Sequence, residues 1–124
     1  MPKVVHFEIP ADNPQKIIKF YTEVFGWKIE KWGDVDYWLV DTGPKTEPGI
    51  GGGIYPKEKP TDGTVNTVAV TDLEAYMEKV KTAGGQIVGS PMDIPKVGRN
   101  VMALDAEGNK FGIIQFSEEG MASM

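Results

Sequence analysis

The sequence predicts an α+β fold built from two tandem βαβββ modules. One order of elements, a strand, a helix and three further strands, occurs twice with an offset of about 60 residues. Each predicted helix begins at a capping Asp or Asn and ends at a glycine. With 124 residues, we expect a single domain over 1–124, with module one at about 3–56, module two at about 64–116 and a tail at 117–124.

The first strand, residues 4–9, alternates between an apolar face and a face that carries His6 and Glu8. The apolar face consists of Val5, Phe7 and Ile9. Because proline has no N–H to donate, Pro10 is expected to end the strand.

A helix follows, with Asp12 or Asn13 as its N-cap and Pro14 in its first turn, where a missing N–H costs nothing. Gly26 suits the left-handed conformation of a C-terminal cap. The apolar positions recur at helical spacing and are expected to face the core. They are Ile17, Ile18, Tyr21, Val24 and Phe25.

Three strands at 27–32, 36–42 and about 51–55 complete module one. Tyr37 and Trp38 lie on opposite faces of the middle one, and we choose Trp38 as the aromatic side chain of a ligand site. The run of three glycines at 51–53 lacks the Lys-Ser/Thr pair and the following helix of a P-loop. It is interpreted as a strand that is kinked or closely approached by another backbone.

Module two repeats the pattern. A strand at 65–71 precedes a helix that is capped by Asp72 and ended by the glycines at 84–85. Strands are expected at 86–88, 99–104 and 110–116, with a Pro-rich loop at 90–98 and a turn at 105–109. The polar tail, 117–124, is expected to fray.

Composition excludes several kinds of chemistry. The chain has no cysteine and one histidine, which rules out thiolate catalysis, disulfides, iron–sulfur clusters and a His-pair metal site within one chain. The net charge is −5 and the lysines are scattered among carboxylates, so no nucleic-acid partner is expected. No apolar run is long enough to span a membrane and the N-terminus has no secretory signal pattern, so a cytoplasmic location is the expectation.

The duplicated pattern resembles the vicinal oxygen chelate superfamily, which includes glyoxalase I, bleomycin-resistance proteins and extradiol dioxygenases. The resemblance covers residues 3–116 and is closest to small glyoxalase-like proteins. The stretches that carry it are His6–Ile9, Phe20–Trp27, Val68–Leu73, Ala83–Gly85, Gly98-Arg99 and Asp105–Gly112. It implies one cup-shaped mixed sheet with the helices outside, and a homodimer.

The resemblance also implies where a metal would be bound in metal-dependent members, through four ligands, two from each module. The first falls on His6, but the matching position of module two falls on Asn66. The other two fall on the glycine run at 51–53 and on Gly112. One ligand of four is therefore left, and we expect neither a metal nor another cofactor.

The function expected from this pattern is binding of a small molecule in a cup that has lost its metal. Its ligand-binding residues are predicted to be His6, Glu8, Trp38, Asn66 and Arg99. His6 and Glu8 share a strand face, as a general base with its orienting partner, as ligand-binding groups or as a relic of a metal site.

Other interpretations stay open for the remaining residues. Asn66 equally suits a backbone partner at a strand end, and Arg99 equally suits an ion pair with Asp105 or a surface carboxylate. Two alternative functions are a metal-dependent lyase, isomerase or dioxygenase with an atypical site around His6, and a ligand-free interaction module. Whether the protein is an enzyme, for example a glyoxalase-related lyase, is left open.

Overall fold

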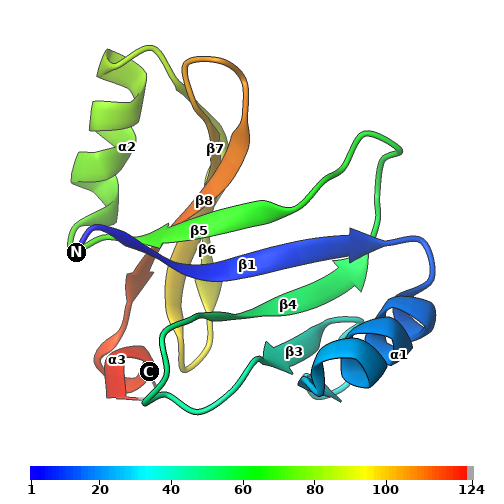
Figure 1. Cartoon of the computed structure of the whole chain (residues 1–124). Coiled ribbons are helices and arrows are strands. Elements are labelled where there is room, and N and C mark those ends of the chain that lie inside the picture. Colours follow the sequence, from blue (N-terminus) through cyan, green and yellow to red (C-terminus); the bar gives the residue numbers. More distant parts are fainter. Residues whose placement is uncertain (123–124) are drawn as a thin grey trace. The chain divides into compact units, whose positions relative to one another are not determined.

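The computed structural model describes residues 1–122 and divides into two compact units. The first unit is residues 6–65, and the second is residues 1–5 together with the chain from 66 onward. The elements in chain order are β1 (Lys3–Ala11), α1 (Pro14–Phe25), β2 (Lys28–Lys31), β3 (Trp38–Asp41), β4 (Gly51–Pro56), β5 (Val65–Ala69), α2 (Leu73–Thr82), β6 (Gln86–Ile94), β7 (Gly98–Leu104), β8 (Lys110–Phe116) and α3 (Glu118–Ala122) (Figure 1). The predicted α+β class and the repeated βαβββ order are confirmed.

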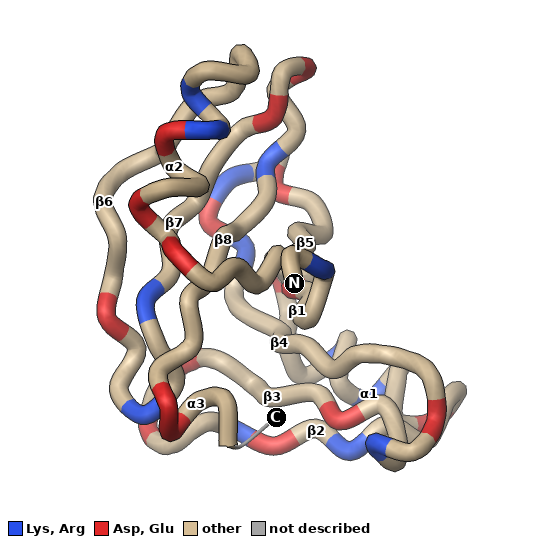
Figure 2. The backbone as a smooth tube through the Cα atoms, turned by 90° about the vertical axis from the view of Figure 1, so that its left-hand side faces the viewer, with Lys and Arg blue, Asp and Glu red and all other residues tan. Residues whose placement is uncertain are grey.

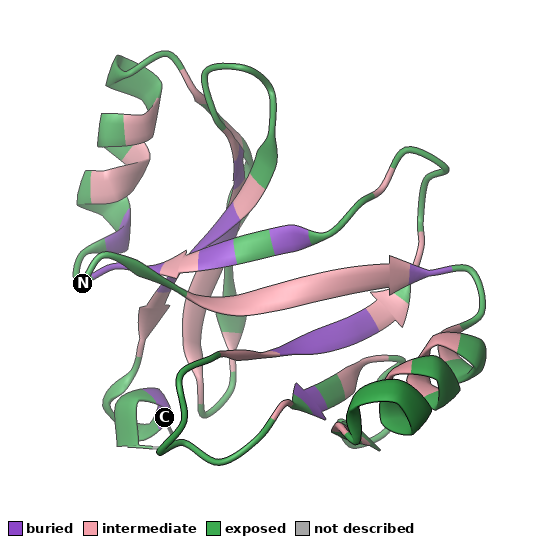
Figure 3. Ribbon diagram, in the orientation of Figure 1, coloured by how far each residue is buried: buried purple, intermediate pink, exposed green. Residues whose placement is uncertain are grey.

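In the first unit the strands follow the order β2-β3-β4-β1, with β1 parallel to β4 and the other pairs antiparallel. The helix α1 packs on one face of these strands through Ile17 and Ile18. The apolar side chains of β1, Phe7 and Ile9, point to that same core, as the alternation predicted. The buried centre of this core is Ala11, Val40 and Ile54, and Figure 3 shows buried residues in the middle of β4.

The second unit repeats this arrangement with the strand order β5-β8-β7-β6, in which β5 is parallel to β8. Its helix α2 contributes the fully buried Leu73, with Tyr76, Met77 and Val80 packed at the margin. The other buried members of its core are Val70, Val101, Ala103 and Ile113. Each unit therefore has a hydrophobic core of its own.

The predicted starts of both helices and the predicted end of α1 are confirmed. Asn13 caps α1, since its Oδ1 accepts a hydrogen bond from the N–H of Lys16 at 3.2 Å, and Gly26 adopts a φ of 70° after the last turn. Asp72 caps α2, since its Oδ1 accepts from the N–H of Ala75 at 3.1 Å. These caps explain why both helices start where the sequence indicates.

The C-terminal half of α1 differs from the prediction. Val24 and Phe25, expected to face the core, are more than half exposed, and Phe20 is equally exposed. Ile17 and Ile18 in the first half of α1 reach the core, whereas Tyr21 stacks on Trp27 with ring centroids 4.8 Å apart. The C-terminal half of α1 thus carries an exposed apolar surface.

Pro10 does not end β1, because the strand continues to Ala11 along β4. The carbonyl of Ala11 accepts a hydrogen bond from the N–H of Lys57 at 2.9 Å, so the backbone polar groups of Ala11 point toward β4. Those of the preceding residue point the other way, because they alternate along a strand. The missing N–H of Pro10 therefore costs no bond to β4.

The segment 90–98, expected to be a loop, is strand over its first half. β6 runs on to Ile94, with a register shift between Val88 and Met92 and with Gly89 at a φ of 77°. It lies at the end of its strand order, where a proline such as Pro91 is tolerated. The strands β2, β3 and β5 are in turn shorter than the predicted 27–32, 36–42 and 65–71.

The tail does not fray as expected, because residues 118–122 form the short helix α3. The N–H of Ser117 donates to the carbonyl of Val97 at 2.9 Å, and Ser117 Oγ accepts from the N–H of Gly120 at 3.0 Å. Gly120 is buried against the backbone of Val97, where a side chain has no room. Residues 123–124 of the predicted tail lie outside the described part of the chain.

Lys and Arg are interspersed with Asp and Glu along the backbone of each unit (Figure 2). Several form ion pairs, such as Lys19 with Glu23 at 3.9 Å. None of the helices in residues 1–122 is both long enough and apolar enough to cross a bilayer.

Removing the cap of α2 tests the predicted origin of that helix. Asp72→Ala should lower the free energy of unfolding by about 1 kcal/mol, because one N–H of the first turn loses its partner. That loss corresponds to a fall in Tm of about 4 °C, measurable by calorimetry. Asp72→Asn, which keeps the accepting oxygen, should retain most of the stability, and equal losses in both variants would contradict the role of the cap.

Candidate functional site

A polar cluster lies on the face of the first-unit sheet that is opposite the core. His6 and Glu8 point away from the core because they alternate with Phe7 and Ile9 along β1. In the strand register, Glu8 pairs with Gly53 of β4, and Gly53 pairs in turn with Leu39 of β3. Directly paired residues share a face, so these three positions lie side by side.

Tyr37, which directly precedes β3, joins the two polar residues of β1. Its hydroxyl donates a hydrogen bond to Glu8 Oε2 at 2.7 Å, and His6 Nε2 lies 2.7 Å from the Tyr37 hydroxyl oxygen. His6 Nε2 and Glu8 Oε2 are themselves 3.9 Å apart. The phenol is therefore the bridge between the imidazole and the carboxylate.

The backbone around Tyr37 holds it in this place. The N–H of Trp32 donates to the Tyr37 carbonyl at 2.8 Å, and the N–H of Tyr37 donates to the carbonyl of Val35 at 2.8 Å. The Trp32 ring packs edge-on against the Tyr37 ring, with centroids 6.0 Å apart. The turn between β2 and β3 thus directs the phenol toward β1.

The glycine run of β4 makes room for these contacts. A side chain at Gly51 would meet the carbonyl oxygen of Val40, and one at Gly52 would meet the backbone and ring of Phe7. The interpretation that another backbone approaches this strand is confirmed. Gly53 has a different neighbour, because a Cβ there would overlap the hydroxyl and ring of Tyr37.

Burial and charge perturb the titration of the cluster. Burial lowers the pKa of His6, while the nearby Glu8 carboxylate opposes that shift. The pKa of Tyr37 is raised far above its ordinary range by burial, by the negative charge of Glu8 and by the hydrogen bond to it. At neutral pH the cluster therefore contains an uncharged imidazole and an uncharged phenol.

The cluster stays accessible from outside, since the side chains of His6 and Glu8 are 32% and 26% exposed. Leu39 and Trp32 add partly exposed apolar surface, 44% and 39% respectively. Polar groups beside apolar and aromatic surface are typical of small-molecule sites.

The structure places Trp38 away from this cluster. Trp38 packs with the core under α1, and its register partner is the buried Ile54. Of the two aromatic residues that the alternation places on opposite faces, Tyr37 and not Trp38 contacts His6 and Glu8. We therefore replace Trp38 by Tyr37 in the candidate site.

Two further predicted residues lie in the second unit. Asn66 is an exposed residue of β5. The Arg99 guanidinium forms an ion pair with Glu74, Nη1 to Oε1 at 2.8 Å, and its Nε lies 3.7 Å from Asp93 Oδ1. This pairing raises the pKa of Arg99 and lowers that of Glu74. Arg99 therefore forms ion pairs with surface carboxylates, which is one of the two interpretations given for this residue.

Few side chains that could bind a metal ion lie close together. In residues 1–122, no three His, Asp or Glu side chains are grouped so that they could hold an ion. Gly112 of β8 faces Thr67, and a Cβ built on it would lie 2.9 Å from Thr67 Oγ1. The hydroxyl of Tyr37 fills the space beside Gly53 in the same way.

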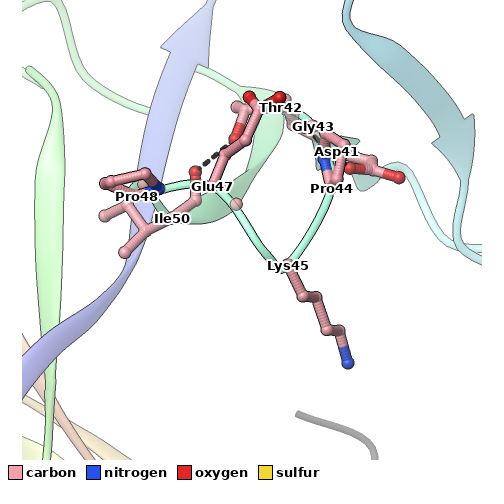
Figure 4. A pocket seen from close by; sticks show the side chains of 11 residues that line it. Asp41, Thr42, Gly43, Pro44, Lys45, Glu47, Pro48 and Ile50 are labelled. Carbon is pink, nitrogen blue, oxygen red and sulfur yellow. Dashed lines mark hydrogen bonds between the residues drawn. The ribbon is translucent and has the colours of Figure 1, made fainter.

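A separate cavity of about 260 Å³ lies under the loop between β3 and β4. It is lined by residues 40–45 and 47–51, and Figure 4 shows their side chains. Thr42 Oγ1 donates to the carbonyl of Ile50 at 2.7 Å across the base of this loop. The bond closes the loop on itself, and the cavity does not include the polar cluster.

Comparison with known proteins identifies the family. A sequence model of the Glyoxalase/Bleomycin resistance protein/Dioxygenase superfamily matches residues 3–113. The chain belongs to this superfamily. Among solved structures, methylmalonyl-CoA epimerase from Mycobacterium tuberculosis superposes with a TM-score of 0.70 at 15% identity, over 98% of this chain and 91% of that one. A superfamily member from Vibrio splendidus 12B01 gives 0.66 at 16% identity, over 94% and 100%.

Curated relatives of the superfamily are more similar in sequence. The putative glyoxylase CFP32 of Mycobacterium tuberculosis is 30% identical over 115 residues, which cover 87% of this chain. They cover 42% of that relative, so the chain spans less than half its length. A glyoxylase-like domain-containing protein of Didymella fabae is also 30% identical over 115 residues, covering 86% of this chain and 88% of its own.

Removing the Tyr37 hydroxyl should show how far the cluster depends on it. In Tyr37→Phe, His6 Nε2 and Glu8 Oε2 lose their shared partner, and we expect the free energy of unfolding to fall by about 1–3 kcal/mol. Urea denaturation measures this loss. Tyr55→Phe is the matched control, expected to change stability by less than about 0.5 kcal/mol. The central role of Tyr37 is contradicted if the two variants are equally stable.

Proposed function

We propose that this superfamily member binds a small molecule at the polar cluster of His6, Tyr37 and Glu8, without a metal ion. The observation that carries the proposal is the bridge of two 2.7 Å hydrogen-bond contacts through the Tyr37 hydroxyl. A half-buried, hydrogen-bonded cluster with accessible members can orient a ligand or exchange a proton with it. We expect sequestration of a ligand or simple proton transfer on it.

The residues do not fit the metal site of metal-dependent superfamily members. Such a catalytic site needs about three protein ligands and an open position. His6 Nε2 is engaged with Tyr37, and the strand positions at Gly53 and Gly112 have no side chain and are filled by Tyr37 and Thr67. No catalytic step through a metal is therefore proposed.

The alternative function is a metal-dependent lyase, isomerase or dioxygenase with an atypical site. The proximity of His6 and Glu8, 3.9 Å apart, favours it, because both are common metal ligands. The fold neighbour named methylmalonyl-CoA epimerase shows the fold alone at 15% identity, so its activity is not transferred.

Other expectations accompany this proposal. The exposed apolar residues of α1, Phe20, Val24 and Phe25, support a homodimer. The ligand-binding roles of Asn66 and Arg99, the single-domain organisation and the cytoplasmic location stay predictions from the sequence.

Metal content separates the two functions. We expect purified protein to hold no stoichiometric divalent ion by elemental analysis, and added zinc, nickel or manganese to leave its Tm unchanged, because too few ligands are grouped. The control is His6→Gln, which should behave identically. A stoichiometric ion that stabilises the protein and is lost in His6→Gln would establish the alternative.

Ligand binding is tested by a thermal-shift screen of small aromatic and α-keto compounds. A true ligand at 100 times its Kd should stabilise the protein by about 2.7 kcal/mol, which raises Tm by several degrees. The shift should disappear in His6→Gln and persist in Tyr76→Phe, a tyrosine on α2 of the second unit. If no compound shifts the Tm, the ligand-free interaction module is favoured instead.

A further inference from the structure

We propose that Tyr37 holds His6 in the Nε2–H tautomer, so that Nδ1 is the proton-accepting atom offered to an uncharged ligand bearing an O–H or N–H group. This inference rests on the proposed function for the ligand, but the assignment of the tautomer concerns the free protein. Gly53 is then a positioning residue that keeps Tyr37 in place.

The number of protons in the bridge determines which ring nitrogen of His6 carries a hydrogen. A phenol has one hydrogen to donate, and that of Tyr37 is directed to Glu8 Oε2 at 2.7 Å. The Tyr37 oxygen can therefore only accept from His6 Nε2, which lies 2.7 Å away on its other side. Nε2 carries the hydrogen, and in an uncharged imidazole Nδ1 then has a free lone pair.

The other ring nitrogen of His6, Nδ1, has different surroundings. No hydrogen bond within residues 1–122 involves this atom, and none of their buried side-chain nitrogens or oxygens lacks a partner. Nδ1 is therefore reached by solvent, in agreement with the 32% exposure of the His6 side chain. A ligand that displaces this solvent meets an acceptor.

The charges around the cluster favour an uncharged ligand. Glu8 lies within the cluster, and Tyr55 of β4 follows Gly53 by two residues on the same face. Burial raises the pKa of Tyr55, and the negative charges of Asp62, Glu8 and Glu58 raise it further. The nearby Lys57 is paired with Asp12, Nζ to Oδ2 at 3.9 Å. An anion would thus meet like charge, whereas an uncharged donor would not.

Gly53 has a conformational role in the cluster. Any Cβ at this position would overlap the Tyr37 hydroxyl, so a side chain there must move the phenol out of the bridge. Gly63 offers a matched control, because a Cβ built on it meets no atom within 4 Å. The pair distinguishes loss of the bridge from a general effect of replacing glycine.

The single histidine makes the tautomer directly observable. In protein labelled with ¹⁵N in the histidine ring, every ring signal belongs to His6. At neutral pH and without ligand, we expect a protonated Nε2 and an unprotonated Nδ1. Tyr37→Phe and Gly53→Ala should both lose this preference and give averaged signals, while Tyr55→Phe and Gly63→Ala should keep it.

The tautomer assignment is overturned if Nδ1 carries the hydrogen in the unmodified protein. It is also overturned if Tyr37→Phe leaves the ring signals unchanged. Should Gly53→Ala not fold, Tyr37→Phe alone decides, because its phenyl ring keeps the same packing volume.

The ligand class is tested on the same spectrum with phenol and benzoate, two probes of similar size. Phenol should shift the Nδ1 signal saturably, and benzoate should bind at least tenfold more weakly. Equal binding of benzoate overturns the preference for an uncharged ligand. If neither probe shifts the signal, the proposed ligand class fails, and the thermal-shift screen decides separately whether the protein binds a small molecule. The tautomer stands or falls on the free protein.

Discussion

The chemistry of the first unit depends on one tyrosine hydroxyl that lies between an imidazole and a carboxylate. Without it, two half-buried polar groups on β1 would face each other at 3.9 Å with no shared partner. A polar network of this kind is stable only when every member is satisfied. The turn that directs Tyr37 and the glycine that leaves room for it are both consequences of that requirement.

The two units share a fold pattern but not a chemistry. Each has its own hydrophobic core, so the sheet face opposite the helix is free to differ between them. In the first unit this freedom produced a hydrogen-bonded cluster at His6, whereas β8 of the second unit carries Gly112 against Thr67. Superfamily membership therefore explains the scaffold, and the named side chains must explain the function.

Local rules predicted much of this structure. The caps at Asn13 and Asp72 and the alternation along β1 depend on neighbours in the sequence, and the prediction succeeded there. It failed where a distant contact decides. Alternation placed Tyr37 and Trp38 on opposite faces, but only the register with β4 and α1 shows which face is which. The same holds for Pro10, which is tolerated within β1 because its missing N–H would point away from β4. It also holds for α3, because the carbonyl of Val97 accepts the hydrogen bond of Ser117 just before this helix.

The irregular strand β6 has a consequence for solubility. An exposed edge strand is a template on which a strand of another molecule can add, and long flat edges favour aggregation. On β6 the exposed Val88 and Met92 are separated by a break in register, with Gly89 and Pro91 between them. An incoming strand finds no continuous row of backbone donors and acceptors there. This segment, which contributes nothing to the polar cluster, makes the β6 edge a poor template for strand addition.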